Sequence, residues 1–363
     1  MSDVFEIDHL PNRTIRYNGQ EYLFFSGTAY LGLQQNPAFQ QLVIEAISRY
    51  GTVFGSSRNG NLRLGIYEEA ESKLAASVGA QAALTLSSGM MAGQVIVNWL
   101  CGQNATFLYG PNAHPALWHQ PNVTLPAVSF ADWTTQLTDQ IRSVFAAKTT
   151  SGPVAILVNS LDAVRSDYYD FGWVNDLPAD LPITLIVDDS HGIGVLNSGR
   201  GIWPQIAHRP NVMLLVTASL AKAMGLPGGV IFGENTTLAT IRQTAFFGAC
   251  SPMPPAYLDA YLRAGMLYAE GHERLTQNIG LAEKLLRPTG LFQQARKYPV
   301  FFTEHDELYP YLLEENILLY SFAYPTAADR ANTRIVISAF HKPADIEKVA
   351  SKIDSYSLYK YRR

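Results

Sequence analysis

Short runs of apolar residues alternate with stretches of helical periodicity through the middle of the chain. Continuous apolar runs of this kind are typical of strands that are buried on both faces of a sheet. We predict such strands at residues 82–86, 154–158, 183–188, 212–216 and 229–233. A helix is predicted from Gly89 to Leu100, directly after the first of these strands. Alternating strands and helices imply a three-layer α/β/α domain with a mostly parallel sheet.

The pattern changes after about residue 250. One long helix with charged residues on two faces is predicted from Ala256 to about Leu286. Strands at 300–303 and 334–338, followed by a closing helix at 343–353 with a proline in its first turn, complete a smaller α+β domain.

The length of the chain agrees with two domains. With 363 residues, 47% of them hydrophobic, the chain can bury a full core, and domains usually have about 100–200 residues. We expect an N-terminal arm, a large domain built on the predicted sheet and a small C-terminal domain, which span residues 1–35, 36–247 and 248–363.

Composition excludes several classes of protein. The net charge is −4 and the 27 basic and 31 acidic residues are well mixed, so the basic stripe of a nucleic-acid-binding protein is missing. The two cysteines, Cys101 and Cys250, are too few and too far apart for a disulfide framework or a cysteine-based zinc site. No apolar run approaches the ~18 residues of a membrane span, and the N-terminus lacks the pattern of a signal peptide. We therefore expect a soluble, cytoplasmic protein.

Lys222 and Asp188 form the most informative pair in the sequence. Lys222 follows a predicted strand and has small neighbours, which let a bulky ligand approach the backbone. A desolvated lysine has a lowered pKa, which suits it to form an imine with an aldehyde cofactor and to carry protons. Asp188 ends a predicted strand, where ligands of open α/β sheets bind, and its carboxylate can hold a pyridine nitrogen protonated. The pair predicts an enzyme that uses pyridoxal 5'-phosphate (PLP); a surface lysine that opens a helix is the alternative.

The phosphate group of such a cofactor needs hydrogen-bond donors. Ser88, Gly89 and Met90 join a predicted strand to a predicted helix, so free backbone N–H groups point outward there. Ser219, three residues before Lys222, can add a hydroxyl. The alternative for Ser88 is a plain N-cap that needs no ligand.

Three further side chains are candidates. His191 can hydrogen-bond the cofactor's phenolic oxygen, and His114 can stack on its ring and act as an acid–base group. Arg334 can clamp a substrate carboxylate bidentately. An ordinary loop histidine and a salt-bridged strand arginine are the alternatives. A metal site at Asp188 and Asp189 is a further alternative, although no second acidic cluster accompanies it, and we expect no metal.

Several segments match the motifs of one known family. They are Tyr30-Leu-Gly-Leu33, Asp188-Asp-Ser-His-Gly-Ile-Gly-Val195 with Gly199-Arg-Gly201, Ser219-Leu-Ala-Lys222, Met253-Pro-Pro255, and Arg334 with His341. On these motifs, between about residues 28 and 353, the chain resembles the α-oxoamine synthase group of fold-type I PLP-dependent enzymes, in the aminotransferase class I/II superfamily. Biosynthetic enzymes such as 8-amino-7-oxononanoate synthase, 2-amino-3-ketobutyrate CoA ligase and serine palmitoyltransferase belong to this group.

The resemblance implies roles for the candidate residues. It implies that Lys222 carries the internal aldimine, that Asp188 pairs with the pyridine nitrogen and that His191 lies near the phenolic oxygen. It places His114 on the ring and Arg334 on the carboxylate of the amino acid. It also implies a homodimer with shared active sites, in which Ser251 reaches the phosphate bound by the neighbouring subunit.

The sequence departs from the family in the part that selects the substrate. Thr28, a candidate substrate-binding residue, stands close to where the family has asparagine. The family's Ser-Met-(Asp/Glu)-Gly-Asp segment is changed within residues 159–167, where Ala163 replaces a serine and Arg165 an acidic residue. The cofactor motifs are thus kept, whereas the substrate motifs are altered.

The resemblance implies a C-acyltransferase. An amino acid would form an external aldimine, and loss of a proton or CO₂ would give a quinonoid that attacks an acyl-CoA or another acyl thioester to yield an α-amino ketone. One alternative keeps PLP but performs transamination or other Cα chemistry. Another is a PLP-fold protein that has lost its substrate site and serves a binding or regulatory role.

Overall fold

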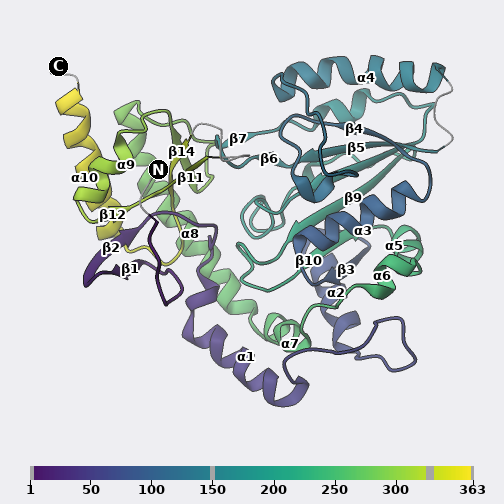
Figure 1. The fold of residues 1–363 in the computed structure, drawn as a ribbon, viewed down its shortest axis with the longest axis horizontal. Coiled ribbons are helices and arrows are strands. Elements are labelled where there is room, and N and C mark those ends of the chain that lie inside the picture. The colour runs from purple at the N-terminus through teal and green to yellow at the C-terminus, as the bar shows by residue number, and fades with distance from the viewer. Residues whose placement is uncertain (1–3, 148–151, 324–330, 361–363) are drawn as a thin grey trace. The chain divides into compact units, whose positions relative to one another are not determined.

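The computed structural model describes residues 4–147, 152–323 and 331–360, which form two compact units (Figure 1). The central unit comprises Gln40–Leu161 and Tyr168–Gly265. The terminal unit comprises Met1–Phe39, Asp162–Asp167 and Met266–Arg363. The expected division into 1–35, 36–247 and 248–363 stays a prediction.

A six-stranded sheet forms the middle of the central unit (Figure 1). Its strands, in spatial order, are β3 (Ala82–Leu86), β10 (Gly229–Gly233), β9 (Val212–Ser219), β8 (Ile183–Asp188), β5 (Val154–Asn159) and β4 (Thr106–Tyr109). The strands β4, β5, β8 and β9 are parallel to their neighbours in this series, and β10 is antiparallel to both β9 and β3. The predicted strands and the mostly parallel sheet are therefore confirmed.

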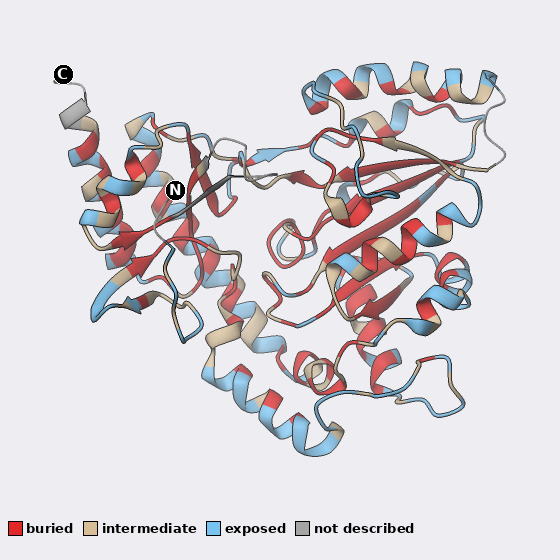
Figure 2. Ribbon diagram, in the orientation of Figure 1, coloured by how far each residue is buried: buried red, intermediate tan, exposed pale blue. Residues whose placement is uncertain are grey.

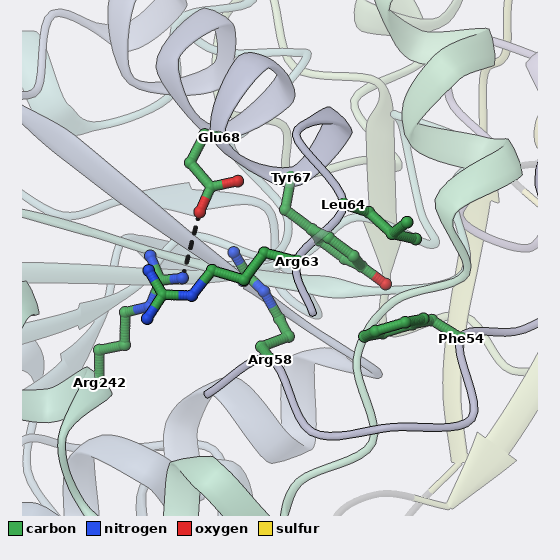
Figure 3. A pocket seen from close by; sticks show the side chains of 7 residues that line it. All are labelled: Phe54, Arg58, Arg63, Leu64, Tyr67, Glu68 and Arg242. Atoms are coloured by element: carbon green, nitrogen blue, oxygen red, sulfur yellow. Dashed lines mark hydrogen bonds and ion pairs between the residues drawn. The ribbon is translucent and has the colours of Figure 1, made fainter. Parts of the chain in front are cut away.

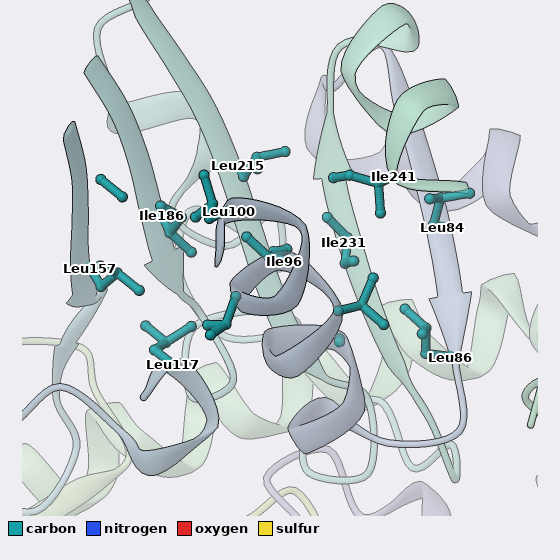
Figure 4. Packing of buried hydrophobic residues seen from close by; sticks show 14 of the residues in the cluster. Leu84, Leu86, Ile96, Leu100, Leu117, Leu157, Ile186, Leu215, Ile231 and Ile241 are labelled. Carbon is teal, nitrogen blue, oxygen red and sulfur yellow. The ribbon is translucent and has the colours of Figure 1, made fainter. Parts of the chain in front are cut away.

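Helices cover both faces of this sheet. The helices of the central unit are α1 (Pro37–Tyr50, which begins in the terminal unit), α2 (Ile66–Val78), α3 (Gly89–Cys101), α4 (Phe130–Ala146), α5 (Asn235–Arg242), α6 (Ala245–Ala249) and α7 (Pro255–Arg263). Helix α3 packs against a cluster that includes Leu157, Ile186 and Leu215 (Figure 4). Because side chains alternate along a strand, Val158 points to the opposite face, where the nearby ring of Trp133 from α4 lies.

The strands are buried on both faces, as the continuous apolar runs predict. All five residues from Val154 to Val158 have no exposed surface, and the strands of the sheet are largely buried in Figure 2, whereas the outer faces of the helices are exposed. Each fully buried valine or leucine contributes about 1.5–3 kcal/mol relative to an exposed one. The sheet is thus a rigid frame for groups at the ends of its strands.

The described part of the terminal unit contains two small sheets. One has the order β1 (Thr14–Tyr17), β2 (Gln20–Phe24) and β12 (Ile317–Leu318), and the other the order β11 (Val300–Thr303), β14 (Ala331–Val336) and β13 (Tyr320–Ala323). Its helices are α8 (Gly265–Leu286), α9 (Leu308–Glu314) and α10 (Pro343–Lys360). A two-stranded sheet, β6 (Leu161–Asp162) with β7 (Asp167–Tyr168), lies where the chain passes between the units. Short 3₁₀ helices occupy Leu33–Gln35, Pro115–Leu117, Gly172–Asp176, Trp203–Gln205 and Arg287–Thr289.

Buried polar contacts join the two ends of the chain within the terminal unit. The Nε2 atom of His341 lies 2.9 Å from the carbonyl oxygen of Phe24, and its ring stacks on Phe25 at 4.2 Å. Burial lowers the pKa of His341 to about 4, so the ring is neutral at pH 7. Asn278 of α8 donates hydrogen bonds to the carbonyl oxygens of Ser338 and His341. His341, which matches a family motif, thus has a structural role here.

The prediction of one long helix from Ala256 to Leu286 is wrong. Helix α7 ends at Arg263 and α8 begins at Gly265. The ammonium group of Lys73 accounts for the break, because it donates hydrogen bonds to the carbonyl oxygens of Tyr261 and Leu262, 3.4 and 2.7 Å away, at the C-terminal end of α7. This cation comes from α2 and leaves no signal in residues 256–286 themselves.

Two element boundaries also differ from those predicted. The last strand, β14, ends at Val336 rather than at residue 338, because Val336 pairs with Val300, the first residue of β11. The last helix, α10, continues to Lys360 rather than to residue 353. No helix within the described residues is long and apolar enough to cross a membrane.

Candidate active site

The candidate active site lies at the carboxyl edge of the central sheet, where Asp188 lies near His114 and the turn that carries Lys222. Asp188 is the last residue of β8, and the register places it beside Asn159 of β5 and Thr217 of β9. The Oδ1 atom of Asp188 accepts a hydrogen bond from the amide of Ser190 at 2.9 Å. Only 8% of the residue's surface is exposed. Parallel strands present their carboxyl ends at one edge, which is where ligands of such sheets bind.

His114 lies beside Asp188. Its Nδ1 atom is 3.8 Å from Oδ2 of Asp188 and accepts a hydrogen bond from the amide of Ala116 at 3.1 Å. Burial lowers the pKa of His114; the charge of Lys222 lowers it further, while Asp188 acts in the opposite direction. The ring is therefore neutral at pH 7, and because Nδ1 is an acceptor, its proton is assigned to Nε2. Lys222 and His114 are thus close enough to interact electrostatically.

Asn159 fixes the position of His114, and sequence reasoning did not assign it a role. Its side-chain oxygen accepts a hydrogen bond from the amide of His114 at 3.1 Å, and its side-chain nitrogen donates to the carbonyl oxygen of Asn112 at 2.6 Å. The end of β5 thereby holds the loop that carries the imidazole. The signal that could have found it was its alignment with Asp188 at the ends of neighbouring strands.

Lys222 lies in a tight turn between β9 and β10. Two backbone hydrogen bonds close the turn. The amide of Leu220 donates to the carbonyl oxygen of Gly228 at 2.8 Å, and the amide of Leu226 donates to the carbonyl oxygen of Leu220 at 3.0 Å. Both leucine side chains are fully buried, so they anchor the turn, whereas Lys222 is half-buried. Gly225 adopts a left-handed conformation, with φ +66°, that favours glycine.

The N-terminus of α3 lies next to this turn. The hydroxyl of Ser88 caps the helix by accepting a hydrogen bond from the amide of Met91 at 3.1 Å. A Cβ atom on Gly89 would lie 2.6 Å from Cβ of Ser219, so only glycine lets the helix begin this close to β9. The amides of Gly89 and Met90 are in the first turn of α3, where helical N–H groups have no intrahelical acceptor.

Ser190 connects β8 to the lysine turn. Its hydroxyl accepts a hydrogen bond from the amide of Ser219 at 2.8 Å. The preceding backbone contact, from the amide of Asp189 to the carbonyl oxygen of Thr217, also measures 2.8 Å. The serine side chain therefore continues the pairing of β8 with β9 by one further contact, a role that sequence reasoning missed.

The other predicted residues are distributed over both units. His191 is half-buried and follows Ser190 directly, and Ser251 is exposed in the central unit. Arg334 and Thr28 belong to the terminal unit. Arg334 is buried and donates a hydrogen bond from Nη1 to the carbonyl oxygen of Ala163 at 3.1 Å. That Arg334 and Thr28 bind substrate together with the residues of the central unit stays a prediction.

A buried ion pair holds the glycine-rich loop that precedes α2 in place. The guanidinium of Arg58 binds both carboxylate oxygens of Glu71 and lies 4.3 Å from the centre of the Tyr67 ring. Figure 3 shows the small pocket beside it, where Arg242 pairs with Glu68 at 3.1 Å. The ion pair joins this loop to α2 over 13 positions of the chain and could not be predicted from the sequence of the loop.

The arrangement fits PLP. Asp188 offers a carboxylate for a ring nitrogen, Lys222 an amine, His114 a flat neutral ring, and the start of α3 offers amides for a phosphate. The described residues contain no group of three or more histidine, cysteine, aspartate or glutamate side chains that could hold a metal ion.

Fold and site together define a fold-type I PLP-dependent enzyme. A family profile, aminotransferase class I and II, matches residues 22–353, and the chain belongs to this family. Membership confirms PLP as the predicted cofactor. Within the family, the relatives found belong to the α-oxoamine synthase group, as the resemblance predicted.

Two relatives illustrate this. The 8-amino-7-oxononanoate synthase of Petrotoga mobilis is 26% identical, over 94% of this chain and 89% of that protein. The serine palmitoyltransferase of Bacteriovorax stolpii is 25% identical, over 81% of this chain and 71% of that protein.

Solved structures show the same fold. The serine palmitoyltransferase of Sphingomonas wittichii has a TM-score of 0.79 at 15% identity, covering 98% of this chain and 92% of that one. The 8-amino-7-oxononanoate synthase of Francisella tularensis has a TM-score of 0.67 at 20% identity, covering 94% and 99%.

Proposed function

We propose that this chain is an α-oxoamine synthase, a C-acyltransferase that condenses an amino acid with an acyl thioester such as an acyl-CoA. The observation that carries the proposal is the meeting of Asp188, His114 and the Lys222 turn at the carboxyl edge of the sheet, beside the start of α3. The names of the relatives, two different synthases of this kind, support the class of reaction.

The proposed roles follow from the chemistry of each side chain. When bound, PLP supplies an electron sink for a carbanion at the amino acid's Cα. Lys222 would hold the cofactor through its aldehyde carbon and would carry the Cα proton, and Asp188 would hold the ring nitrogen protonated. His191 would donate to the phenolic oxygen. His114 would stack on the ring, and burial, which lowers its pKa, keeps the imidazole in the neutral form that has a free acceptor nitrogen.

The proposed phosphate donors are the amides of Gly89 and Met90 and the hydroxyls of Ser88 and Ser219. The protein is proposed to be a homodimer, in which Ser251 completes the phosphate site of the partner. Arg334 and Thr28 are proposed to bind the carboxylate of the amino acid, with one guanidinium nitrogen fixed by the carbonyl oxygen of Ala163.

The test is an assay of free CoA. Purified protein loaded with PLP is incubated with a panel of amino acids and acyl-CoAs, and we expect CoA release with at least one pair. The substitution Lys222→Ala should abolish both the release and the visible absorbance of the lysine-bound cofactor. The exposed Lys284→Ala on α8 is the matched control and should change neither. Failure of every pair to release CoA, with the cofactor bound, would contradict the proposal.

A second candidate is transamination or other chemistry at Cα. The altered segment motivates it, because Ala163, where the family has a serine, brings no side-chain hydroxyl to the segment that binds the proposed carboxylate clamp Arg334 through its backbone. Amino-acid-dependent conversion of the cofactor to its pyridoxamine form, reversed by a keto acid, would identify this reaction. If PLP binds but neither reaction occurs, a binding or regulatory role is favoured.

A further inference from the structure

A groove in the terminal unit has a volume of about 290 Å³ and shares no residue with the candidate active site. Leu31, Leu33 and Phe340 form part of its apolar floor, and three cations, Arg13, Arg274 and Lys342, stand around it. A volume of this size is close to the lower limit for small-molecule sites. The apolar floor and the cations determine the chemical class of ligand that the groove can bind.

The floor is fixed by close packing. Leu31 and Leu33 are buried, and Gly32 between them has φ +67°. A Cβ atom on Gly32 would lie 3.2 Å from the Phe340 ring, and one on Gly271 of α8 would lie 3.1 Å from the carbonyl oxygen of Leu31. Because these two glycines let the backbone segments approach each other closely, the apolar surface is preformed.

The surrounding charge is positive. Arg13 pairs with Asp345 at 2.7 Å, and Arg274 pairs with Glu270 at 3.4 Å on the exposed face of α8. The ammonium of Lys342 is exposed and forms no ion pair within the described residues. Neither Asp345 nor Glu270, nor any other carboxylate of the described part of the chain, lines the groove.

The residues around the start of α10 leave one cation uncompensated. Lys342 directly precedes this 18-residue helix, whose first turn carries Asp345, and that carboxylate compensates the partial positive charge of the helix end. The backbone amide of Lys342 donates a hydrogen bond to Oδ2 of Asp345 at 2.8 Å, and the Oδ1 atom of the same carboxylate binds Arg13. Asp345 is thus engaged twice, which leaves the charge of Lys342 uncompensated at the groove.

We propose that this groove is a second ligand site, for a small organic anion with a carboxylate or phosphate head on an apolar body. A cavity of about 150 Å³ holds benzene, so the groove can hold roughly ten to twelve non-hydrogen atoms. The apolar body packs on Leu31, Leu33 and Phe340, and the head lies towards Lys342 and Arg274. This site does not depend on the proposed condensation reaction.

The test is titration calorimetry on the full chain loaded with PLP. Octanoate and hexyl phosphate are the probes, and octanol and inorganic phosphate are the controls. We expect at least one probe to bind at least about tenfold more tightly than either control, because floor and charge act together. The preferred head group, carboxylate or phosphate, follows from comparing the two probes.

Matched variants locate the bound probe. Lys342→Glu reverses the uncompensated charge and should weaken binding by about tenfold or more, and Leu267→Asp, which puts a carboxylate into the lining, should do the same. Lys348→Ala, an exposed lysine on α10 outside the groove, should change nothing. Lys222→Ala should also leave probe binding intact, which separates this site from the active site.

Three results would overturn the proposal. They are equal binding of octanol and octanoate, unchanged binding in Lys342→Glu, and loss of binding in Lys222→Ala with retention in Lys342→Glu. The last would place the probe at the candidate active site instead.

Discussion

The carboxyl group of Asp189 shows how one buried residue supports the site next to it. Its Oδ2 atom accepts a hydrogen bond from the amide of Ile202 at 2.8 Å, and a Cβ atom on Gly192 or Gly201 would collide with its carboxylate. The carboxylate thus holds the loop after β8 closed. Burial raises the pKa of Asp189 to about 7.

This raised pKa predicts how stability changes with pH. The folded state holds the Asp189 proton up to about pH 7, whereas the unfolded chain releases it near pH 4, so stability falls as the pH rises through this window. In Asp189→Asn, which cannot ionise, that loss is absent. We measure the free energy of unfolding of both proteins in urea at pH 5 and at pH 8. The difference between variant and parent should shift in favour of the variant by more than about 1 kcal/mol from pH 5 to pH 8. Asp139→Asn, at an exposed position, is the control; an equal gain there would contradict the assignment.

Sequence reasoning found the residues whose own neighbours mark them. Asp188 ends an apolar run and Lys222 lies among small residues, and both signals are local. Asn159 and Ser190 act by hydrogen bonds to residues 45 and 29 positions away, and those pairings exist only once the strands are ordered side by side. Their roles therefore needed the structure.

At the scale of elements, the start of helix α3 approaches the end of strand β9 most closely at Gly89. Sequence predicted both elements because their apolar patterns are strong and continuous. It did not predict the break after α7, which depends on Lys73 from α2. Elements whose limits are set by their own pattern are thus predicted well, and those limited by a distant side chain are not.

The contact between α3 and β9 leads to a prediction about cofactor affinity. In Gly89→Ala the new Cβ would lie 2.7 Å from the Cα atom of Ser219, so the start of α3 must move away from the proposed phosphate site. We expect the dissociation constant for PLP to rise about tenfold or more, as measured by fluorescence titration of the apoprotein.

The matched control is at the other end of the same helix. Gly102, the C-cap of α3, has φ −63°, and a Cβ atom there would come no closer than 3.4 Å to its nearest neighbour, the carbonyl oxygen of Trp99. Gly102→Ala should leave PLP affinity unchanged. Equal effects of both substitutions would show that helix stability, rather than the contact with Ser219, sets the affinity.

At the scale of the whole molecule, the two candidate ligand sites belong to different units. Lys222, Asp188 and the start of α3 are in the central unit, and the groove lies entirely in the terminal unit. A ligand stabilises the folded state of the part it binds by an amount set by its concentration relative to its dissociation constant, about 2.7 kcal/mol at a hundredfold excess. Each ligand should therefore protect its own unit.

Hydrogen exchange of the full chain can measure this protection segment by segment. We expect PLP to slow exchange at the end of β8 and in the turn at 220–228, because these backbone segments carry its proposed contacts. Octanoate should slow exchange in the first turns of α8 and in the segment 339–342 before α10, which line the groove. The two effects should add when both ligands are present, since the sites share no residue. Octanoate-dependent protection at 220–228, or its disappearance when PLP is bound, would show instead that the two ligands compete for one site.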